Sequence, residues 1–219
     1  MKKVALIGAT GYVGRALLKE LLDRGHEVKA IARHPEKLAI EHPHLSLTAL
    51  DVEDGPALTE ACRGCDAVIS AYNPGWANPS IYEDTLRVYP EILAAVKASG
   101  VPRLLIVGGA GSLFVKPGIR LMDTGTLPEA WMPGVTALAR FYLDTLTQES
   151  GIDWVFLSPA ANLGNLKAGI RTGRYRTGKD NLLLDEKGDS FISVEDYAVA
   201  MVDELEQANH HCERFTVAY

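Results

Sequence analysis

The N-terminal residues Met1 to Gly14 read MKKVALIGATGYVG, in which an apolar run leads directly into three closely spaced glycines. The run Val4 to Ile7 is typical of a buried strand, and the residues after the glycines have the periodicity of an amphipathic helix. Gly8 permits a tight turn off the strand, Gly11 lets the backbone approach a pyrophosphate, and Gly14 lets the helix pack close to the sheet. Because the positive end of the helix dipole also faces this turn, the sequence predicts a dinucleotide-binding site.

The end of the second expected strand, Glu27 to Ala32, carries a cation where NAD-selective folds carry an acidic residue. That acidic residue, about twenty positions after the glycines, binds the adenosine ribose. Arg33 occupies the place here, and Lys37 follows one helical turn later. A guanidinium can pair with a 2′-phosphate through two hydrogen bonds, so the sequence favours NADP(H) over NAD(H). The alternative is that both cations are ordinary solvated surface charges.

Composition predicts one globular NAD(P)-binding domain over residues 1–219, with substrate-side loops at 113–134 and 160–190. The chain is 47% hydrophobic and 23% charged, which suffices for a full core. A net charge of −6 without a Lys/Arg-rich run argues against nucleic acid and membrane partners. The first apolar run breaks at Gly8 without a signal-peptide cleavage site, so we expect a cytoplasmic protein. We also expect it to be a monomer or a homodimer.

Three cysteines favour a reducing compartment over a disulfide framework. Cys62 and Cys65 form a C-x-x-C, but the pair ends a helix instead of opening one, so the helix dipole does not lower a thiol pKa. Zinc would need two further ligands, for which His210, His211 and Cys212 are the clustered candidates. We therefore expect a turn of half-buried thiols and no metal site, with redox and zinc roles as alternatives.

Apolar runs and helical patterns alternate along the chain, which requires a parallel sheet covered on both faces. The runs are Val4 to Ile7, Val28 to Ala32, Leu45 to Leu50, Ala67 to Ala71, Leu104 to Val107 and Trp154 to Leu157. The helical patterns are Tyr12 to Arg24, Ala57 to Arg63, Ile81 to Ser99 and Val135 to Ser150. This alternation predicts an α/β fold, a Rossmann-type doubly wound parallel sheet of order 3-2-1-4-5-6 with a small C-terminal substrate-side region. Ser193 to Asp196 predicts a capped helix, and Glu213 to Tyr219 predicts a last strand.

Ligands of such sheets bind beyond the carboxyl ends of the strands. The residues expected to bind the cofactor are Gly8, Thr10, Gly11, Tyr12, Val13, Gly14, Arg33, Lys37, Asp51, Val52, Ser70, Ala71, Tyr72, Gly109 and Pro159. Large apolar side chains that follow the fourth and fifth strands are predicted to bind a flat aromatic substrate, with ordinary core packing as the alternative. They are Trp76, Tyr82, Phe114 and Trp131.

Several motifs carry a family resemblance: GATGYVG (Gly8 to Gly14), RHPEK (Arg33 to Lys37), VGGAGS (Val107 to Ser112), DWVFLSP (Asp153 to Pro159) and ISVEDYA (Ile192 to Ala198). In these motifs the whole chain resembles the atypical short-chain dehydrogenase/reductases. More narrowly, it is similar to their NAD(P)H-binding group often described as NADH-flavin reductases or epimerase/dehydratase-like proteins, with biliverdin reductase B as a distant relative. The resemblance implies a nicotinamide cofactor but does not name a substrate.

The sequence departs from the superfamily at the acid/base pair. Catalytic-tyrosine members use Tyr-x-x-x-Lys on the helix before the sixth strand, whereas Tyr142 is followed by Leu146 here. Tyr175 and Lys179 have the right spacing but lie in a glycine-flanked segment that we expect to be a loop. Ser112 matches the family's serine after the fifth strand and is the candidate catalytic residue, unless its hydroxyl only closes the glycine-rich turn.

Without that pair, we expect an NAD(P)H-dependent oxidoreductase that passes a hydride to an acceptor needing little acid catalysis, such as a flavin, a quinone or another planar molecule. A first alternative is a non-catalytic NADP(H) redox sensor that acts through a protein partner. A second is an NAD(P)-dependent epimerase or dehydratase, which would need an acid/base pair that the sequence does not supply.

Overall fold

The main sheet of the protein has the strand order β10-β12-β8-β5-β4-β1-β2-β3. The computed structural model describes residues 1–164 and 170–219. The strands are β1 (Lys3–Ile7), β2 (Glu27–Ala32), β3 (Leu45–Ala49), β4 (Ala67–Ser70), β5 (Arg103–Val107), β8 (Asp153–Ser158), β10 (Arg176–Gly178) and β12 (Glu213–Ala218). All neighbouring strands are parallel except β10, which pairs antiparallel with β12. The predicted order 3-2-1-4-5-6 is confirmed, with β8 as the sixth strand and β12 and β10 added beyond it.

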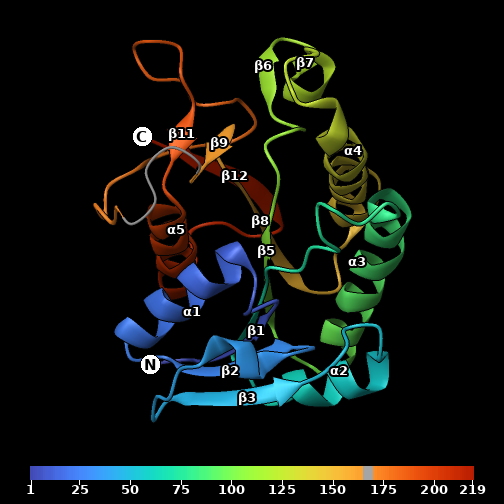
Figure 1. Cartoon of the computed structure of the whole chain (residues 1–219), viewed down its shortest axis with the longest axis vertical. Coiled ribbons are helices and arrows are strands. Elements are labelled where there is room, and N and C mark those ends of the chain that lie inside the picture. The colour runs from blue at the N-terminus through green and yellow to red at the C-terminus, as the bar shows by residue number, and fades with distance from the viewer. Residues whose placement is uncertain (165–169) are drawn as a thin grey trace.

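Helices cover both faces of this sheet (Figure 1). Helix α1 (Tyr12–Asp23) packs against α5 (Val194–Gln207) on one side. On the other side α3 (Ile81–Ala98) packs against α2 (Gly55–Cys62) and α4 (Met132–Arg140). The carboxyl ends of the parallel strands therefore lie between two helical layers.

The strands feed two separate apolar cores because successive side chains point to opposite faces of a sheet. In β1, Val4 and Leu6 join the core under α1 and α5, whereas Ala5 and Ile7 join the core under α2 and α3. All four side chains are fully buried. This two-sided burial explains why β1, β4, β5 and β8 read as continuous apolar runs, whereas the mostly exposed β3 reads LSLTA.

The two long segments predicted as substrate-side loops contain short elements of their own. Residues 113–134 form the hairpin of β6 (Phe114–Lys116) and β7 (Ile119–Arg120), followed by the short 3₁₀ turns η2 (Leu121–Asp123) and η3 (Glu129–Trp131). Within 160–190, β9 (Asn162–Leu163) pairs with β11 (Phe191–Ile192), and residues 165–169 lie outside the described part. Both segments rise above the carboxyl edge of the sheet (Figure 1).

The segment predicted to be helical from Val135 to Ser150 contains three types of helix. The α-helical part α4 ends at Arg140, a π-helical turn η4 follows over Phe141–Thr145, and the 3₁₀ turn η5 completes it over Leu146–Gln148. Such π-helical turns occur often beside functional sites. The short 3₁₀ turn η1 (Pro35–Leu38) follows β2.

The C-x-x-C thiols are buried, and burial raises the pKa of Cys62 to about 12 and also raises the pKa of Cys65. Both cysteines are therefore protonated and unreactive at neutral pH. In the described ranges, no three His, Cys, Asp or Glu side chains converge to hold a metal ion. Nor does any helix among those residues have the length and apolar character needed to cross a membrane.

Candidate functional site

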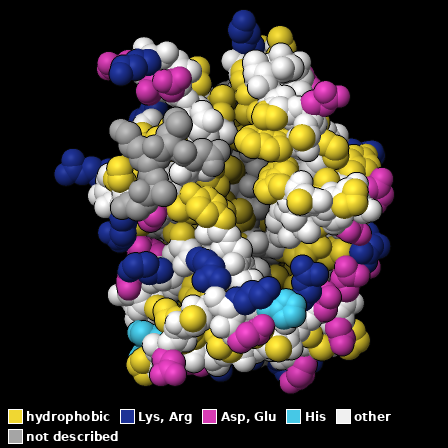
Figure 2. Space-filling model, viewed as in Figure 1, with side chains coloured by type: hydrophobic (Ala, Val, Ile, Leu, Met, Phe, Trp, Pro, Cys, Tyr) yellow, Lys and Arg dark blue, Asp and Glu magenta, His cyan; other side chains and the backbone are white. Residues whose placement is uncertain are grey.

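A cavity of about 820 Å³ lies along the carboxyl edge of the sheet, where α1, α3 and α4 also contribute to its wall. Hydrophobic side chains line the hollow, and Lys and Arg side chains gather below it (Figure 2). Each of six parallel strands supplies a wall residue close beyond its carboxyl end: Gly8, Arg33, Asp51, Ala71, Gly108 and Pro159. The cavity thus follows the strand ends, which is the general location of ligands in this class of fold.

The glycine turn forms a cradle at one end of the cavity. Gly8 has a φ of +77°, and a Cβ there would lie 2.6 Å from the carbonyl oxygen of Ala71. A Cβ at Gly14 would lie 2.1 Å from the carbonyl oxygen of Gly8, so α1 can approach the turn only through a glycine. Gly14 is buried, while Gly11 lines the cavity beside the first turn of α1. These positions fit the pyrophosphate of a dinucleotide, which needs close backbone approach at a helix N-terminus.

Three other predicted cofactor residues of this turn, Thr10, Tyr12 and Val13, also line the cavity. Near the ends of β2 and β3 the wall contains Arg33 and the acidic pair Asp51 and Glu53. Hydrogen bonds from Arg87 hold the pKa of Glu53 below its ordinary value, and Arg33 lowers it slightly further. The Arg33 side chain is exposed, so its guanidinium is accessible to a phosphate group.

Lys37, which the sequence predicted as a second cation beside Arg33, does not belong to the cavity wall. Its exposed side chain projects from η1, while its carbonyl oxygen accepts a 2.8 Å hydrogen bond from Arg15 Nη2. Arg15 Nε also donates to the carbonyl of Thr10 at 3.0 Å. Arg15 therefore bridges the glycine turn and the Arg33 segment, and sequence reasoning missed it because it lies one position beyond the glycine motif.

The remaining predicted cofactor residues divide between the wall and the sheet. Ala71, Tyr72, Val52, Gly109 and Pro159 line the cavity. Ser70 does not: it is 1% exposed within β4, and its hydroxyl has no hydrogen-bond partner among the described residues.

Two of the four predicted substrate-binding aromatics lie close together in the cavity wall. Trp76 and Trp131 line it, with ring centroids 6.1 Å apart and exposed fractions of 56% and 41%. Trp76 also lies against Gly134 of α4, where a Cβ would come within 3.0 Å of its ring. These two side chains form an open apolar wall that we call the tryptophan wall.

Tyr82 and Phe114 are not part of this cavity wall, so the structure does not bring them together with Trp76 and Trp131 there. Tyr82, in the first turn of α3, accepts a 2.8 Å hydrogen bond from Arg140 Nη1 with its hydroxyl. Phe114 lies in β6, where Arg120 stands 5.5 Å above its ring. Both residues were chosen because they follow a strand in the sequence, but this position does not make the side chain point into the cavity.

Ser112 lines the cavity and is 2% exposed. Its hydroxyl oxygen accepts a 2.8 Å hydrogen bond from Arg214 Nη1, a residue of β12 more than one hundred positions away. Asp180 in turn accepts hydrogen bonds from Nε and Nη2 of Arg214. Ser112 therefore has a long-range cationic partner, and does not merely close its own turn.

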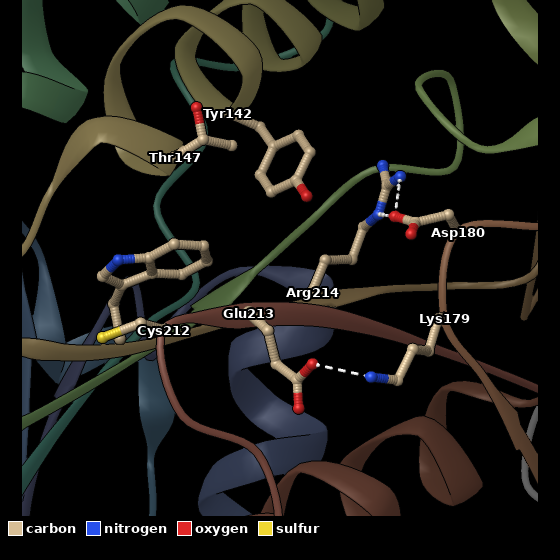
Figure 3. Close-up of a pocket in the computed structure, with 8 residues that line it drawn as sticks. Tyr142, Thr147, Lys179, Asp180, Cys212, Glu213 and Arg214 are labelled. Atoms are coloured by element: carbon tan, nitrogen blue, oxygen red, sulfur yellow. Dashed lines mark hydrogen bonds and ion pairs between the residues drawn. The ribbon is translucent and has the colours of Figure 1, made fainter.

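Tyr142 faces a second cavity of about 210 Å³, which the lining of the first does not include (Figure 3). Its ring stacks on Phe156 at 4.8 Å, and burial raises the pKa of its phenol although Arg214 lowers it. Leu146 replaces the lysine four positions later. Tyr142 is thus outside the wall of the main cavity and lacks the lysine partner of the family motif, although the Arg214 guanidinium lies 4.6 Å from its ring.

Comparison with known proteins agrees with this geometry. Residues 8–208 match a family described as NAD(P)H-binding. The chain belongs to this NAD(P)H-binding family. A protein from Bacteroides thetaiotaomicron, provisionally described as an epimerase, is 56% identical, with 100% of this chain and 97% of that chain covered and a TM-score of 0.93.

Two further relatives cover nearly the whole of this NAD(P)H-binding chain. The protein YwnB of Bacillus subtilis strain 168 is 42% identical over 217 residues, which is 98% of this chain and 97% of YwnB. A Streptococcus pneumoniae protein, provisionally described as an NADH-flavin reductase, is 35% identical with a TM-score of 0.81, and the match covers 100% and 99% of the two chains. The two solved structures therefore share the fold of this chain, while their descriptions name different reactions.

Proposed function

We propose that this NAD(P)H-binding protein is an NADPH-dependent reductase of planar acceptors such as flavins and quinones. The observation that carries the proposal is the combination, in one cavity, of a glycine cradle for a dinucleotide and the tryptophan wall. A flat aromatic acceptor gains contact area and stacking energy against such a wall. The bound nucleotide would supply the hydride, and the protein would supply orientation and an apolar site.

The acid/base requirements of the competing reactions support a reductase over an epimerase. Three tyrosines line the cavity, and burial raises the pKa of each of them: Tyr12, Tyr72 and Tyr89. A catalytic tyrosine needs the opposite shift, because it must ionise near neutral pH. A reduction in which the acceptor itself stabilises the added charge does not need such a group.

Arg33 supports NADPH as the preferred nucleotide. It is exposed at the end of β2 and belongs to the cavity wall, so its guanidinium can pair with a 2′-phosphate. We propose Arg15 as a second phosphate contact in place of Lys37, because its guanidinium lies between the glycine turn and η1. A cytoplasmic location remains part of the proposal, since NADPH would be supplied there.

A direct assay tests the reductase function. Purified protein is mixed with NADPH and, separately, with FMN or a benzoquinone, and the loss of NADPH absorbance is followed against a protein-free control. A nucleotide sugar is incubated with the protein and NADP⁺, and its products are separated by chromatography, because epimerisation consumes no nucleotide. We expect oxidation with FMN or the quinone, competitive inhibition by NADP⁺, and no conversion of the sugar. Tight NADPH binding without reduction of any acceptor above the control would contradict the proposal and favour a sensor. Conversion of the sugar would favour the epimerase.

A further inference from the structure

The hydroxyl of Ser112 has a defined direction because of its partner. A guanidinium carries only hydrogen-bond donors, so in the 2.8 Å contact with Arg214 Nη1 the serine oxygen must accept. Its own proton is then free to point elsewhere, and Ser112 forms part of the main cavity wall. The serine hydroxyl therefore retains one hydrogen-bond donor that Arg214 does not use.

Arg214 is held firmly enough to impose this direction. It is 5% exposed, and Asp180 Oδ1 accepts from Nε at 3.1 Å and from Nη2 at 2.5 Å. The guanidinium carbon also stands 4.6 Å from the centre of the Tyr142 ring, a cation–π geometry. Figure 3 shows Arg214 between Tyr142 and Asp180, beside the second cavity. Contacts from three separate segments of the chain leave this side chain little rotational freedom.

The charge of Arg214 also changes the strength of the serine as a donor. A hydrogen bond from a cation polarises the hydroxyl that accepts it and strengthens the next hydrogen bond of the chain. Both Ser112 and Arg214 are almost fully buried, where such effects are weakly screened. The countercharge on Asp180 is 56% exposed and contacts the opposite edge of the guanidinium, so solvent screens it more.

We propose that Arg214 is a positioning residue that makes Ser112 a hydrogen-bond donor to an oxygen of the acceptor on which negative charge develops. This inference rests on the proposed reductase function and narrows its substrates to acceptors that carry a conjugated carbonyl oxygen, as quinones and flavins do. In the overall reaction NADPH is oxidised to NADP⁺, the acceptor gains the hydride and becomes an anion, and water then supplies the proton. Ser112 stabilises the anion without losing its own proton.

A double-mutant cycle on quinone reduction tests the coupling between the two residues. We expect Ser112→Ala to lower kcat by roughly a hundredfold, as the loss of an oxyanion donor does. Arg214→Met should lower kcat by about tenfold in the wild-type background and should have no effect on kcat when Ser112 is already alanine. Equal losses in both backgrounds would show a merely structural role and overturn the proposal.

Arg103→Met provides the matched control, because Arg103 is also a buried arginine of the sheet, paired with Asp153 and Glu204 outside the cavity wall. It should destabilise the protein but leave kcat within about twofold of the wild type. If Arg214→Met does not fold, Arg214→Lys takes its place in the cycle, since a lysine keeps the charge but cannot hold Asp180 and Ser112 in one planar fork. Absence of coupling in that cycle overturns the proposal equally.

Binding of 4-nitrophenol to the NADP⁺ complex separates this inference from the proposed function, because it requires no turnover. The ring is planar, and the absorbance of the phenolate reports its ionisation. A donor aimed at the bound oxygen should lower the pKa of the phenol by about one unit, and Ser112→Ala and Arg214→Met should each remove that shift. A lowered phenol pKa without quinone reduction would contradict the proposed reductase function but support Ser112 as a hydrogen-bond donor. Quinone reduction without a lowered phenol pKa would contradict only the donor role of Ser112.

Discussion

Arg33 is the residue on which discrimination between the two nicotinamide nucleotides depends. We expect Arg33→Asp to weaken NADPH binding by roughly ten- to a hundredfold, because it removes a charge-assisted hydrogen-bonded contact and adds repulsion against the 2′-phosphate. NADH lacks this phosphate, so its affinity should stay within about twofold. Fluorescence titration of the purified protein with each nucleotide measures both values.

Lys37→Asp gives a control with the same change of charge, a few residues away. Its side chain is exposed and outside the cavity wall, so the variant should alter NADPH affinity by less than about threefold through screened long-range attraction. If the two variants weaken NADPH equally, the 2′-phosphate is held by diffuse charge and not by Arg33.

The tryptophan wall leads to a different prediction for substrate binding. Trp76→Ala should raise the KM of the planar acceptor about tenfold, through lost stacking and apolar contact. Because 56% of Trp76 is already exposed, the melting temperature should fall by only a few degrees. Steady-state kinetics and calorimetry measure the two quantities.

Phe114→Ala is the matched aromatic truncation, since its ring lies in β6 outside the cavity wall. It should leave the acceptor KM unchanged. An unchanged KM in Trp76→Ala, or a raised one in Phe114→Ala, would move the acceptor away from the tryptophan wall.

At the scale of elements, the N-terminus of α5 ties the C-terminal region together. Ser193 accepts from the backbone N–H of Asp196, as its capping pattern predicted. The fully buried Asp196 carboxylate accepts hydrogen bonds from both the backbone and hydroxyl groups of Thr172, from the backbone of Gly173 and from the hydroxyl of Tyr219. Burial opposes this charge, but the hydrogen bonds from Thr172 and Tyr219 outweigh it and hold the pKa of Asp196 below its ordinary value.

A carboxyl with a lowered native pKa stabilises the fold above its unfolded-state pKa, and this contribution is lost as pH falls through the native pKa. Asp196→Asn should therefore lower the free energy of unfolding by about 2–3 kcal/mol at pH 7. The difference from the wild type should shrink progressively below about pH 4, where the wild-type carboxyl also becomes protonated. Urea titrations at several pH values measure the free energy of unfolding of the wild type and of Asp196→Asn across this range.

Asp23→Asn is the control for Asp196→Asn, because Asp23 forms only an exposed i,i+4 ion pair with Lys19. It should change stability by less than about 0.5 kcal/mol. If the difference in the free energy of unfolding between wild type and Asp196→Asn stayed constant as the pH fell below 4, the charge of Asp196 would contribute nothing to stability.

The elements that sequence predicted well are those with a strong local signal. The strands β1, β4, β5 and β8 are apolar because both of their faces are buried, whereas the edge strand β3 is mostly exposed. The glycine turn permits few alternative backbones. The strand β10 carries no such signal, since Arg176–Gly178 is short and polar. The contact of Ser112 with Arg214 joins segments 102 positions apart, and although Ser112 belongs to a recognisable motif, no sequence pattern pairs it with Arg214. Helical periodicity likewise cannot distinguish an α-helix from the π-helical turn at Phe141–Thr145.

At the scale of the whole molecule, the cavity contacts the ends of six strands and helices of both layers. A ligand there binds only when all of these elements are assembled, so it should stabilise the protein as one cooperative unit. NADP⁺ at about one hundred times its Kd should raise the melting temperature by roughly 5–10 °C, with a single calorimetric transition. In Arg33→Asp the rise with NADP⁺ at the same concentration should be much smaller, while the rise with NAD⁺ should persist. Two transitions, of which the nucleotide shifts one alone, would show instead that the two helical layers unfold independently.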